Sequence, residues 1–129
     1  MCHPFDEGTR KLMIETLAEH DITHHVTGTM VSIEGPRFST RAESHMFRSW
    51  GADLINMTTC PEAALAKELG LLYAAFAMST DYDAWREGEE SVSVAAVLAV
   101  IKKNSENTTK AILGVIPKIA AKDWSAEIK

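Results

Sequence analysis

Two polar clusters follow short apolar runs in this sequence of 129 residues. The first is Met-Thr-Thr-Cys-Pro-Glu at 57–62, and the second is Ser-Thr-Asp-Tyr-Asp at 79–83. Short apolar runs bounded by turn residues are typical of buried strands, and ligands of open α/β sheets bind at the carboxyl ends of strands. The hydroxyls and carboxylates at these two strand ends are therefore the first candidates for a functional site.

Asp81 and Asp83 stand two residues apart, which places both carboxylates on one side of the chain if the strand continues. One acid can then hold a proton for a leaving group while the other sets its pKa through like-charge proximity. The alternative is a pair of solvated turn residues, which is the usual situation of acidic side chains. From this tripeptide alone we favour the solvated alternative.

Thr58 and Thr59 offer hydroxyls and backbone amides beside a predicted helix start, an arrangement that suits an anion. The alternative for Thr59 is a helix cap, because Glu62 follows it three residues later in the capping-box spacing. We favour the cap for Thr59, and for Thr58 the two interpretations stay open.

The histidines and cysteines do not predict a metal site. His20 and His24 have the spacing of helical ligands, but the residues between them are typical of a helix exit. Cys2 and Cys60 match no metal or disulfide pattern, and we interpret Cys60 as a packed thiol.

Composition limits the class of partner. The net charge of -5 and the pI near 5.5 argue against nucleic acid or an anionic membrane as the main partner. The longest apolar stretch, 69–78, is interrupted by Gly70 and is too short to span a bilayer. With no secretory signal before the first predicted helix, we expect a reducing cytoplasmic location, with the nucleus as an open alternative.

The pattern of apolar residues predicts alternating helices and strands in one domain over 1–129. The first half of the chain is expected to form a helix over 9–19 capped by Thr9 or Asp6, a strand in 27–34, and a helix from Thr40 to Gly51 with Glu43 in a capping box. A strand over 53–57, a helix over 59–70 and a strand over 71–78 should follow. The last elements are a long helix from Ser91 or Ser93 to a break at Pro117 and the opening of a further helix over 122–129. The near-continuous apolar run 71–78 is typical of a strand buried on both faces. This alternation predicts an α/β fold.

The stretches 28–44, 50–62 and 80–83, in this order, closely resemble the trimeric purine nucleoside phosphorylase family, and within it the branch that cleaves 5′-methylthioadenosine. The resemblance implies a purine nucleoside phosphorylase-type α/β fold with a central mixed sheet flanked by helices. It covers the later part of the family's chain, so we expect N-terminal strands and a C-terminal helix to be missing.

The activity that the resemblance implies is phosphorolysis, in purine and methionine salvage. Inorganic phosphate, the co-substrate, attacks the anomeric carbon of 5′-methylthioadenosine and releases adenine and 5-methylthioribose 1-phosphate. No cofactor is implied, and the full-length protein is expected to be a homotrimer. The alternatives are a purine nucleoside phosphorylase of other specificity and a short, non-catalytic isoform that acts as an interaction or ligand-holding module.

The family's pattern also implies roles for individual residues. Asp81 would protonate or hydrogen-bond ring nitrogen 7 of the purine and accept from its 6-amino group, with Asp83 in support. Met57 would pack against the ribose, Thr58 would help to hold phosphate, and Phe38 would lie against the base. The substrate-binding set as a whole comprises Phe38, Ser39, Met57, Thr80, Val94, Val97 and Leu98.

Three positions argue for adenine and a methylthio group. Relatives that cleave inosine and guanosine have Asn at the place of Asp81 and Glu at the place of Ser39, whereas a carboxylate at 81 suits the amino donor of adenine. Those relatives also place a His near the start of the long helix, where this chain has Val94. An apolar wall leaves a 5′-hydroxyl without a partner, at a cost of about 1–3 kcal/mol.

The alternative for this helix is that its apolar positions Val94, Val97, Leu98 and Ile101 form only its core face. The Gly/Ser loop and the Arg-His pair that supply most phosphate contacts in the family are absent from this sequence. We therefore expect the 129 residues alone to bind phosphate weakly and to turn over little.

Overall fold

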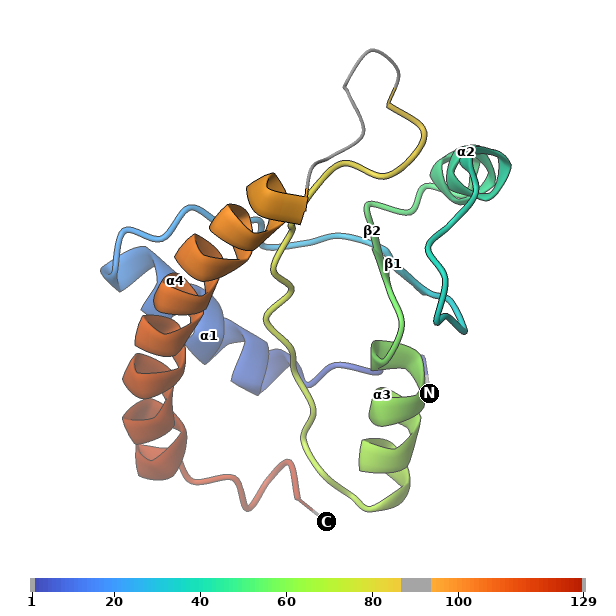
Figure 1. Cartoon of the computed structure of the whole chain (residues 1–129). Helices are drawn as coiled ribbons and strands as arrows, with labels where there is room; N and C mark the ends of the chain where they lie inside the picture. Colours follow the sequence, from blue (N-terminus) through green and yellow to red (C-terminus); the bar gives the residue numbers. More distant parts are fainter. Residues whose placement is uncertain (1, 87–93, 129) are drawn as a thin grey trace.

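The computed structural model describes residues 2–86 and 94–128, and the side chains among them except those of 94–97. Its elements are α1 (Glu7–Glu19), β1 (Met30–Ser32), α2 (Arg41–Ser49), β2 (Leu54–Asn56), α3 (Thr59–Glu68) and α4 (Val94–Ala121) (Figure 1). The predicted α/β character is confirmed, with α1 and α4 packed together on one side and the sheet with α3 on the other. The expected caps Ser91 and Ser93 lie outside the described residues.

The two strands pair in parallel, with Met30 opposite Leu54 and Ser32 opposite Asn56. The chain crosses from one strand to the next through α2, as parallel pairing requires. The carboxyl ends of both strands therefore lie at the same edge. These two strands make up the sheet in the described part of the chain, where the resemblance implies a larger mixed sheet.

The first two helices begin where the sequence predicts. Asp6 is the cap of α1, and its carboxylate accepts from the Thr9 amide at 2.6 Å, which decides between the two expected caps. The capping box of α2 is present: Thr40 Oγ1 accepts from the Glu43 amide at 3.3 Å, and Glu43 Oε2 accepts from the Thr40 amide at 2.8 Å. Gly51, with φ of +78°, follows the end of α2.

The predicted capping box at the start of α3 is wrong. Thr59 is the first helical residue, and Thr58 before it makes no side-chain capping bond. Asn56 Oδ1 instead accepts from the amides of Thr58 and Thr59 at 3.0 and 2.9 Å, and Ser32 Oγ accepts from the next amide at 3.1 Å. Side chains at the strand ends satisfy the helix start, which leaves the Glu62 carboxylate to accept from another hydroxyl.

The predicted strand at 71–78 is also wrong. The segment runs irregularly from the end of α3, and Leu71 and Met78 are 57% and 48% exposed (Figure 1). A strand requires a neighbour that completes its hydrogen-bond ladder. Among the described residues, the backbone of 72–78 makes a single backbone hydrogen bond, which the Asp6 amide donates to the Tyr73 carbonyl at 2.8 Å. This bond does not form a ladder with another strand.

The long helix continues through Pro117 to Ala121, so the predicted break is wrong. Proline lacks one amide and disturbs the turn before it. Here the helix nevertheless continues for four residues beyond the proline, from Lys118 to Ala121. The expected helix after it is replaced by a single turn over 125–127. An ion pair from Lys122 to Glu127, at 2.9 Å, closes this turn.

The main core lies between α1 and α4. Its buried residues are Met13, Thr16, Ala111 and Val115. Gly114 allows the close approach, because a Cβ atom at this position would lie 2.8 Å from His20 Nε2 and from Thr16 Cγ2. The packing of α4 on α1 therefore depends on its second half.

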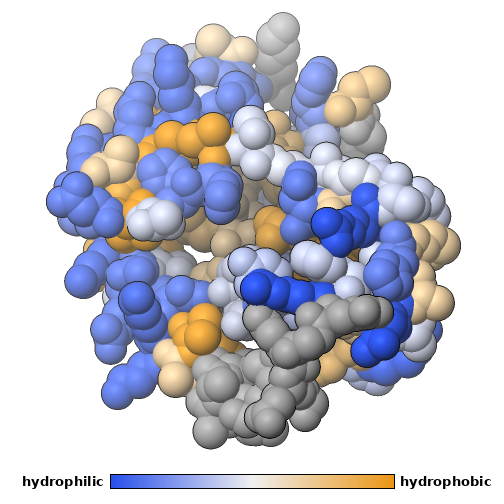
Figure 2. All heavy atoms as spheres, turned by 90° about the horizontal axis from the view of Figure 1, so that it is seen from above, coloured by the Kyte–Doolittle hydropathy of each residue, from blue (hydrophilic) through white to orange (hydrophobic). Residues whose placement is uncertain are grey.

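Apolar side chains also lie on the surface, where Figure 2 shows hydrophobic patches between hydrophilic residues. On α4 the exposed ones are Leu98, Val100, Ile101, Ile112, Leu113 and Ile116. The expectation that Leu98 and Ile101 lie on a core face is thus wrong, with exposures of 58% and 40%. None of the described helices is both long enough and apolar enough to cross a membrane.

Candidate functional site

The loop after β1 and the turn after β2 lie against each other. Gly35 adopts a φ of +70°, and a Cβ atom at this position would lie 2.8 Å from the Met57 sulfur. The absence of a side chain at Gly35 therefore lets Met57 approach the loop backbone. Since 35–39 contains Phe38 and Ser39, the structure brings three of the predicted site residues to one edge of the sheet.

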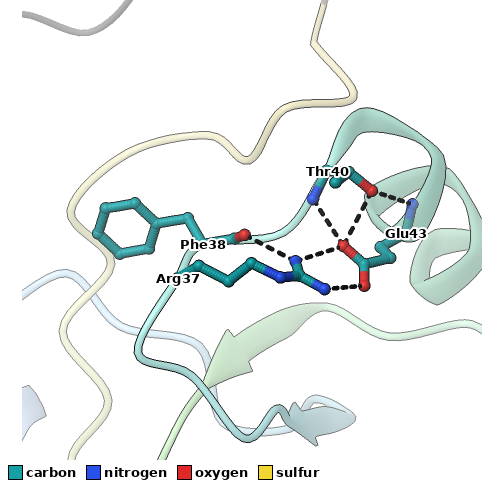
Figure 3. A network of polar contacts seen from close by, with 4 residues as sticks. All are labelled: Arg37, Phe38, Thr40 and Glu43. Atoms are coloured by element: carbon teal, nitrogen blue, oxygen red, sulfur yellow. Dashed lines mark hydrogen bonds and ion pairs between the residues drawn. The ribbon is translucent and has the colours of Figure 1, made fainter.

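Phe38 and Ser39 differ sharply in exposure. The Phe38 side chain is 84% exposed, and Figure 3 shows its ring pointing away from the neighbouring polar network. Ser39 Oγ is buried and has no hydrogen-bond partner. An open cavity of about 280 Å³ adjoins this loop, lined by Ile33, Glu34, Gly35, Arg37, Ser39, Glu43 and Phe47. Buried hydroxyls are normally satisfied, so Ser39 is suited to a polar ligand.

Thr58 is exposed beside the start of α3, but the anion site expected from its neighbouring amides is not available. The amides of Thr58 and Thr59 are already bound by Asn56. Hydrogen bonds from the Tyr73 hydroxyl and, to a smaller extent, from the Thr58 hydroxyl hold the pKa of the Glu62 carboxyl below its usual value. Any contact of Thr58 with an anion would therefore have to use its hydroxyl in place of the contact with Glu62.

The two acids of the second cluster lie in different surroundings. Asp81 is exposed, and its Oδ1 accepts from Thr80 Oγ1 at 2.6 Å. Asp83 is half-buried, and its Oδ2 is buried without a partner. The expected placement of both acids along one strand is not found, because 79–83 is not a strand.

Contacts with two helices fix the backbone around these acids. The Asn104 amide group on α4 donates to the Ser79 carbonyl at 2.8 Å. The Trp85 amide donates to Ser44 Oγ on α2 at 3.1 Å, and the Arg48 guanidinium lies 3.9 Å from the centre of the Trp85 ring. The segment that carries Asp81 and Asp83 is thus held at both of its ends.

The two clusters are not linked in the described part of the chain, where no hydrogen bond or ion pair joins 80–83 to Met57 or Thr58. The side chains of Val94 and Val97 lie outside the described residues, and Leu98 is exposed. Within the same ranges, no cluster of three His, Cys, Asp or Glu side chains is arranged to hold a metal.

Asn56 and Ser32 are the residues that the sequence interpretation missed. Asn56 is among the best capping residue types and lies three residues before the predicted cap Thr59, so it carried a usable signal. Ser32 reaches the Cys60 amide at the same helix start only because β1 lies beside β2, which is not visible in the local sequence. Cys60 is exposed, and its interpretation as a packed thiol is wrong.

A short parallel sheet, flanked by helices and carrying polar side chains beyond its carboxyl edge, defines an α/β protein with a candidate ligand site at the strand ends. The sequence profile described as "Phosphorylase superfamily" matches residues 1–117. The chain belongs to the phosphorylase superfamily, and the purine nucleoside phosphorylase-type fold is confirmed as an incomplete α/β portion.

Named relatives make this resemblance more specific. S-methyl-5′-thioadenosine phosphorylase of Anopheles gambiae is 54% identical over 134 residues, covering 100% of this chain and 48% of the relative. The protein of the same name from Xenopus tropicalis is 54% identical and covers 97% of this chain and 44% of the relative. The chain thus spans about half the length of these curated relatives.

Solved structures of methylthioadenosine phosphorylases also match this chain. Methylthioadenosine phosphorylase from Schistosoma mansoni in complex with adenine superposes with a TM-score of 0.91 at 37% identity, covering 99% of this chain and 50% of that one. A single-substitution variant of the Schistosoma mansoni adenosine/methylthioadenosine phosphorylase, in complex with methylthioadenosine, gives a TM-score of 0.88 at 35% identity. That match covers 97% of this chain and 48% of the other.

Proposed function

We propose that the natural protein containing this chain catalyses the phosphorolysis of 5′-methylthioadenosine. A phosphate oxygen bonds to the anomeric carbon as the bond from that carbon to the purine breaks, and adenine leaves with a proton. The observation that carries this proposal is the 54% identity, over the complete chain, to a protein named S-methyl-5′-thioadenosine phosphorylase. The binding of adenine by a structural relative at a TM-score of 0.91 supports it.

In this proposal the acids of the second cluster bind the purine. Asp81 accepts from the 6-amino group and hydrogen-bonds the proton at ring nitrogen 7, while its bond to Thr80 limits its rotation. Asp83 supports it. The unpartnered Asp83 Oδ2 favours this role, because a buried carboxylate oxygen requires a donor and the 6-amino group of the purine is one.

Residues at the sheet edge bind the rest of the nucleoside. Met57 packs against the ribose, Phe38 lies on the base, and the Ser39 hydroxyl makes a polar contact with the purine. The contact between Gly35 and Met57 supports this grouping, since it joins the base-binding loop to the ribose-binding turn. Stabilising the oxocarbenium-like transition state then depends on positioning and electrostatic preorganisation.

Phosphate is the co-substrate, and neither a metal nor an organic cofactor takes part. Thr58 contributes its hydroxyl to the phosphate in place of its contact with the Glu62 carboxyl, because its amide is bound to Asn56. Most phosphate donors come from the length of the relatives that this chain does not span. Leu98, with Val94 and Val97, forms the apolar wall for the methylthio group.

The remaining expectations follow from the same proposal. The whole protein forms a homotrimer, acts in purine and methionine salvage, and is located in the cytoplasm, with the nucleus as a second location. Its partners are the small nucleoside and phosphate, and the acidic net charge of -5 argues against nucleic acid.

The test is a phosphate-dependence assay on the longest natural polypeptide that contains this chain. We expect adenine release from 5′-methylthioadenosine to require phosphate and to yield one equivalent of the sugar phosphate. Release at the same rate without phosphate would indicate a hydrolase, and no release under either condition would contradict the proposal.

A further inference from the structure

Arg37 and Glu43 form a two-pronged ion pair across the loop that carries Phe38 and Ser39 (Figure 3). The two terminal nitrogens of Arg37 donate to the two oxygens of Glu43, each at 2.7 Å. Arg37 Nη1 also donates to the Phe38 carbonyl at 3.0 Å. One guanidinium thus binds both the loop backbone and the first turn of α2.

The other end of the loop is held by the same carboxylate. Glu43 Oε2 accepts from the Thr40 amide at 2.8 Å and from Thr40 Oγ1 at 2.9 Å, besides its bond from Arg37. Phe38 and Ser39 therefore lie between two fixed points, the carbonyl of 38 and the amide of 40. The backbone between these points has little freedom to move.

Stability alone is a weak explanation for this arrangement. The Arg37 side chain is 65% exposed, and ion pairs between exposed side chains contribute little to folding because water screens them. The residue that the pair positions is also exposed, since the Phe38 ring is 84% accessible and has no packed layer to hold it. An aromatic ring that protrudes from a fixed backbone is suited to contact a flat ligand at low entropic cost.

We infer that Arg37 is a positioning residue for the purine: with Glu43 it fixes the loop so that Phe38 and Ser39 meet the base of the nucleoside. This inference rests on the proposed function. Arg37 does not touch the reacting atoms, and it acts through the two residues that it holds. It should therefore affect nucleoside binding and leave phosphate binding unchanged.

The first test compares Arg37→Gln with Arg41→Gln in the longest natural polypeptide. Arg41 is also an exposed arginine at the start of α2, and its side chain takes part in none of the hydrogen bonds or ion pairs among the described residues. We expect Arg37→Gln to raise the KM for 5′-methylthioadenosine roughly tenfold, the scale of a small loss of orientation. The KM for phosphate should stay within about twofold, and Arg41→Gln should change neither constant.

Arg37→Lys guards against a folding defect, because it keeps the positive charge but cannot form two parallel bonds and the carbonyl bond together. We expect a nucleoside KM between those of the wild type and Arg37→Gln, with an unchanged melting temperature. Full recovery in Arg37→Lys would show that charge alone suffices and would overturn the positioning role.

The decisive measurement is a mutant cycle in which Arg37→Gln is combined with Phe38→Ala and Ser39→Ala together. If Arg37 acts through Phe38 and Ser39, then Arg37→Gln should have little further effect on nucleoside KM once the ring and the hydroxyl are gone. The inference would be overturned if the substitutions raised the nucleoside KM multiplicatively, or if Arg37→Gln raised the KM values for nucleoside and phosphate equally. In either case the proposed function would still stand, because the wild type would be active. Absence of phosphorolysis in the wild type would instead overturn the proposed function and this inference with it.

Discussion

At the scale of single residues, one oxygen atom of Asn56 organises the start of α3. Asn56 Oδ1 accepts from the Ser32 hydroxyl at 3.0 Å and from the amides of Thr58 and Thr59 at similar distances. The same side chain thus joins β1, β2 and α3. Its Nδ2 is buried without a partner, which leaves a donor beside Met57 and Thr58.

Replacing this side chain should therefore destabilise the protein. We expect Asn56→Ala to lower the free energy of unfolding by about 1–2 kcal/mol, the scale of a lost helix cap. Thr58→Ala is the matched control, since Thr58 makes no side-chain capping bond, and it should cost less than about 0.5 kcal/mol. Denaturant unfolding measures both, and equal losses would show that Asn56 is not the dominant cap.

Position 81 determines purine choice in the proposed reaction. Asp81→Asn replaces one carboxylate oxygen by an amide donor, which would face the 6-amino group of adenine with another donor. We expect the preference for 6-amino over 6-oxo purine nucleosides, measured as the ratio of kcat/KM values, to fall by roughly tenfold or more. The thiol variant Cys60→Ser, at an exposed position, should leave this ratio unchanged. An unaltered ratio in Asp81→Asn would contradict the assignment.

At the scale of elements, α2 depends on an ionised carboxylate at its start. Hydrogen bonds from the Arg37 guanidinium, then from the Thr40 amide and hydroxyl, lower the pKa of Glu43 from 4.5 to about 2. The carboxylate also lies in the first turn, where the helix dipole favours negative charge. Glu43 therefore stays ionised in the folded protein at pH values where it is protonated in the unfolded chain.

This difference predicts acid sensitivity. Because the pKa is depressed on folding, the contribution of Glu43 to stability is present above about pH 4.5 and is lost as the pH falls toward about 2. The melting temperature of Glu43→Gln should lie below that of the wild type at neutral pH, and the two should converge over this window. High salt should reduce the difference, since the pair is exposed. A gap that persists at pH 2 would contradict this cause.

At the scale of the whole molecule, the chain spans about half the length of its named relatives and exposes apolar surface on α4. Phosphate donors of the proposed site are expected outside it. We therefore expect the 129-residue chain alone to release adenine far more slowly than the longest natural polypeptide, assayed side by side. Comparable rates would contradict this expectation. Adenine binding without turnover would favour the alternative of a ligand-holding module.

Local signals predicted much of the fold. The box at Thr40 and Glu43 and the glycine at 51 are recognisable because their partners lie within a few residues. The predicted strand at 71–78 failed because a strand is defined by a neighbour, and the described residues place no ladder beside it. The break at Pro117 failed because a proline inside a helix removes a single backbone hydrogen bond, and α4 continues beyond it to Ala121.

Only part of the candidate site was predicted from the sequence. The residue types at Met57 and Asp81 were recognisable as a pattern, and Gly35 and Met57 do meet at the sheet edge. The use of the Thr58 amide by Asn56 does carry a local capping signal, but the spacing of Thr59 and Glu62 predicted a different cap. The unequal burial of Asp81 and Asp83 could not be predicted, because it depends on how their segment docks onto α2.

The stacking of Arg48 on Trp85, at 3.9 Å, provides an optical reporter for this docked segment. A cation over an indole alters the electric field that its excited state experiences, so the emission of Trp85 is sensitive to small displacements of its surroundings. Trp85 lies two residues from Asp83, and Trp50 and Trp124 can be replaced by phenylalanine to isolate its signal. Titration of such a protein with adenine would then follow purine binding by fluorescence, separately from the turnover of any nucleoside.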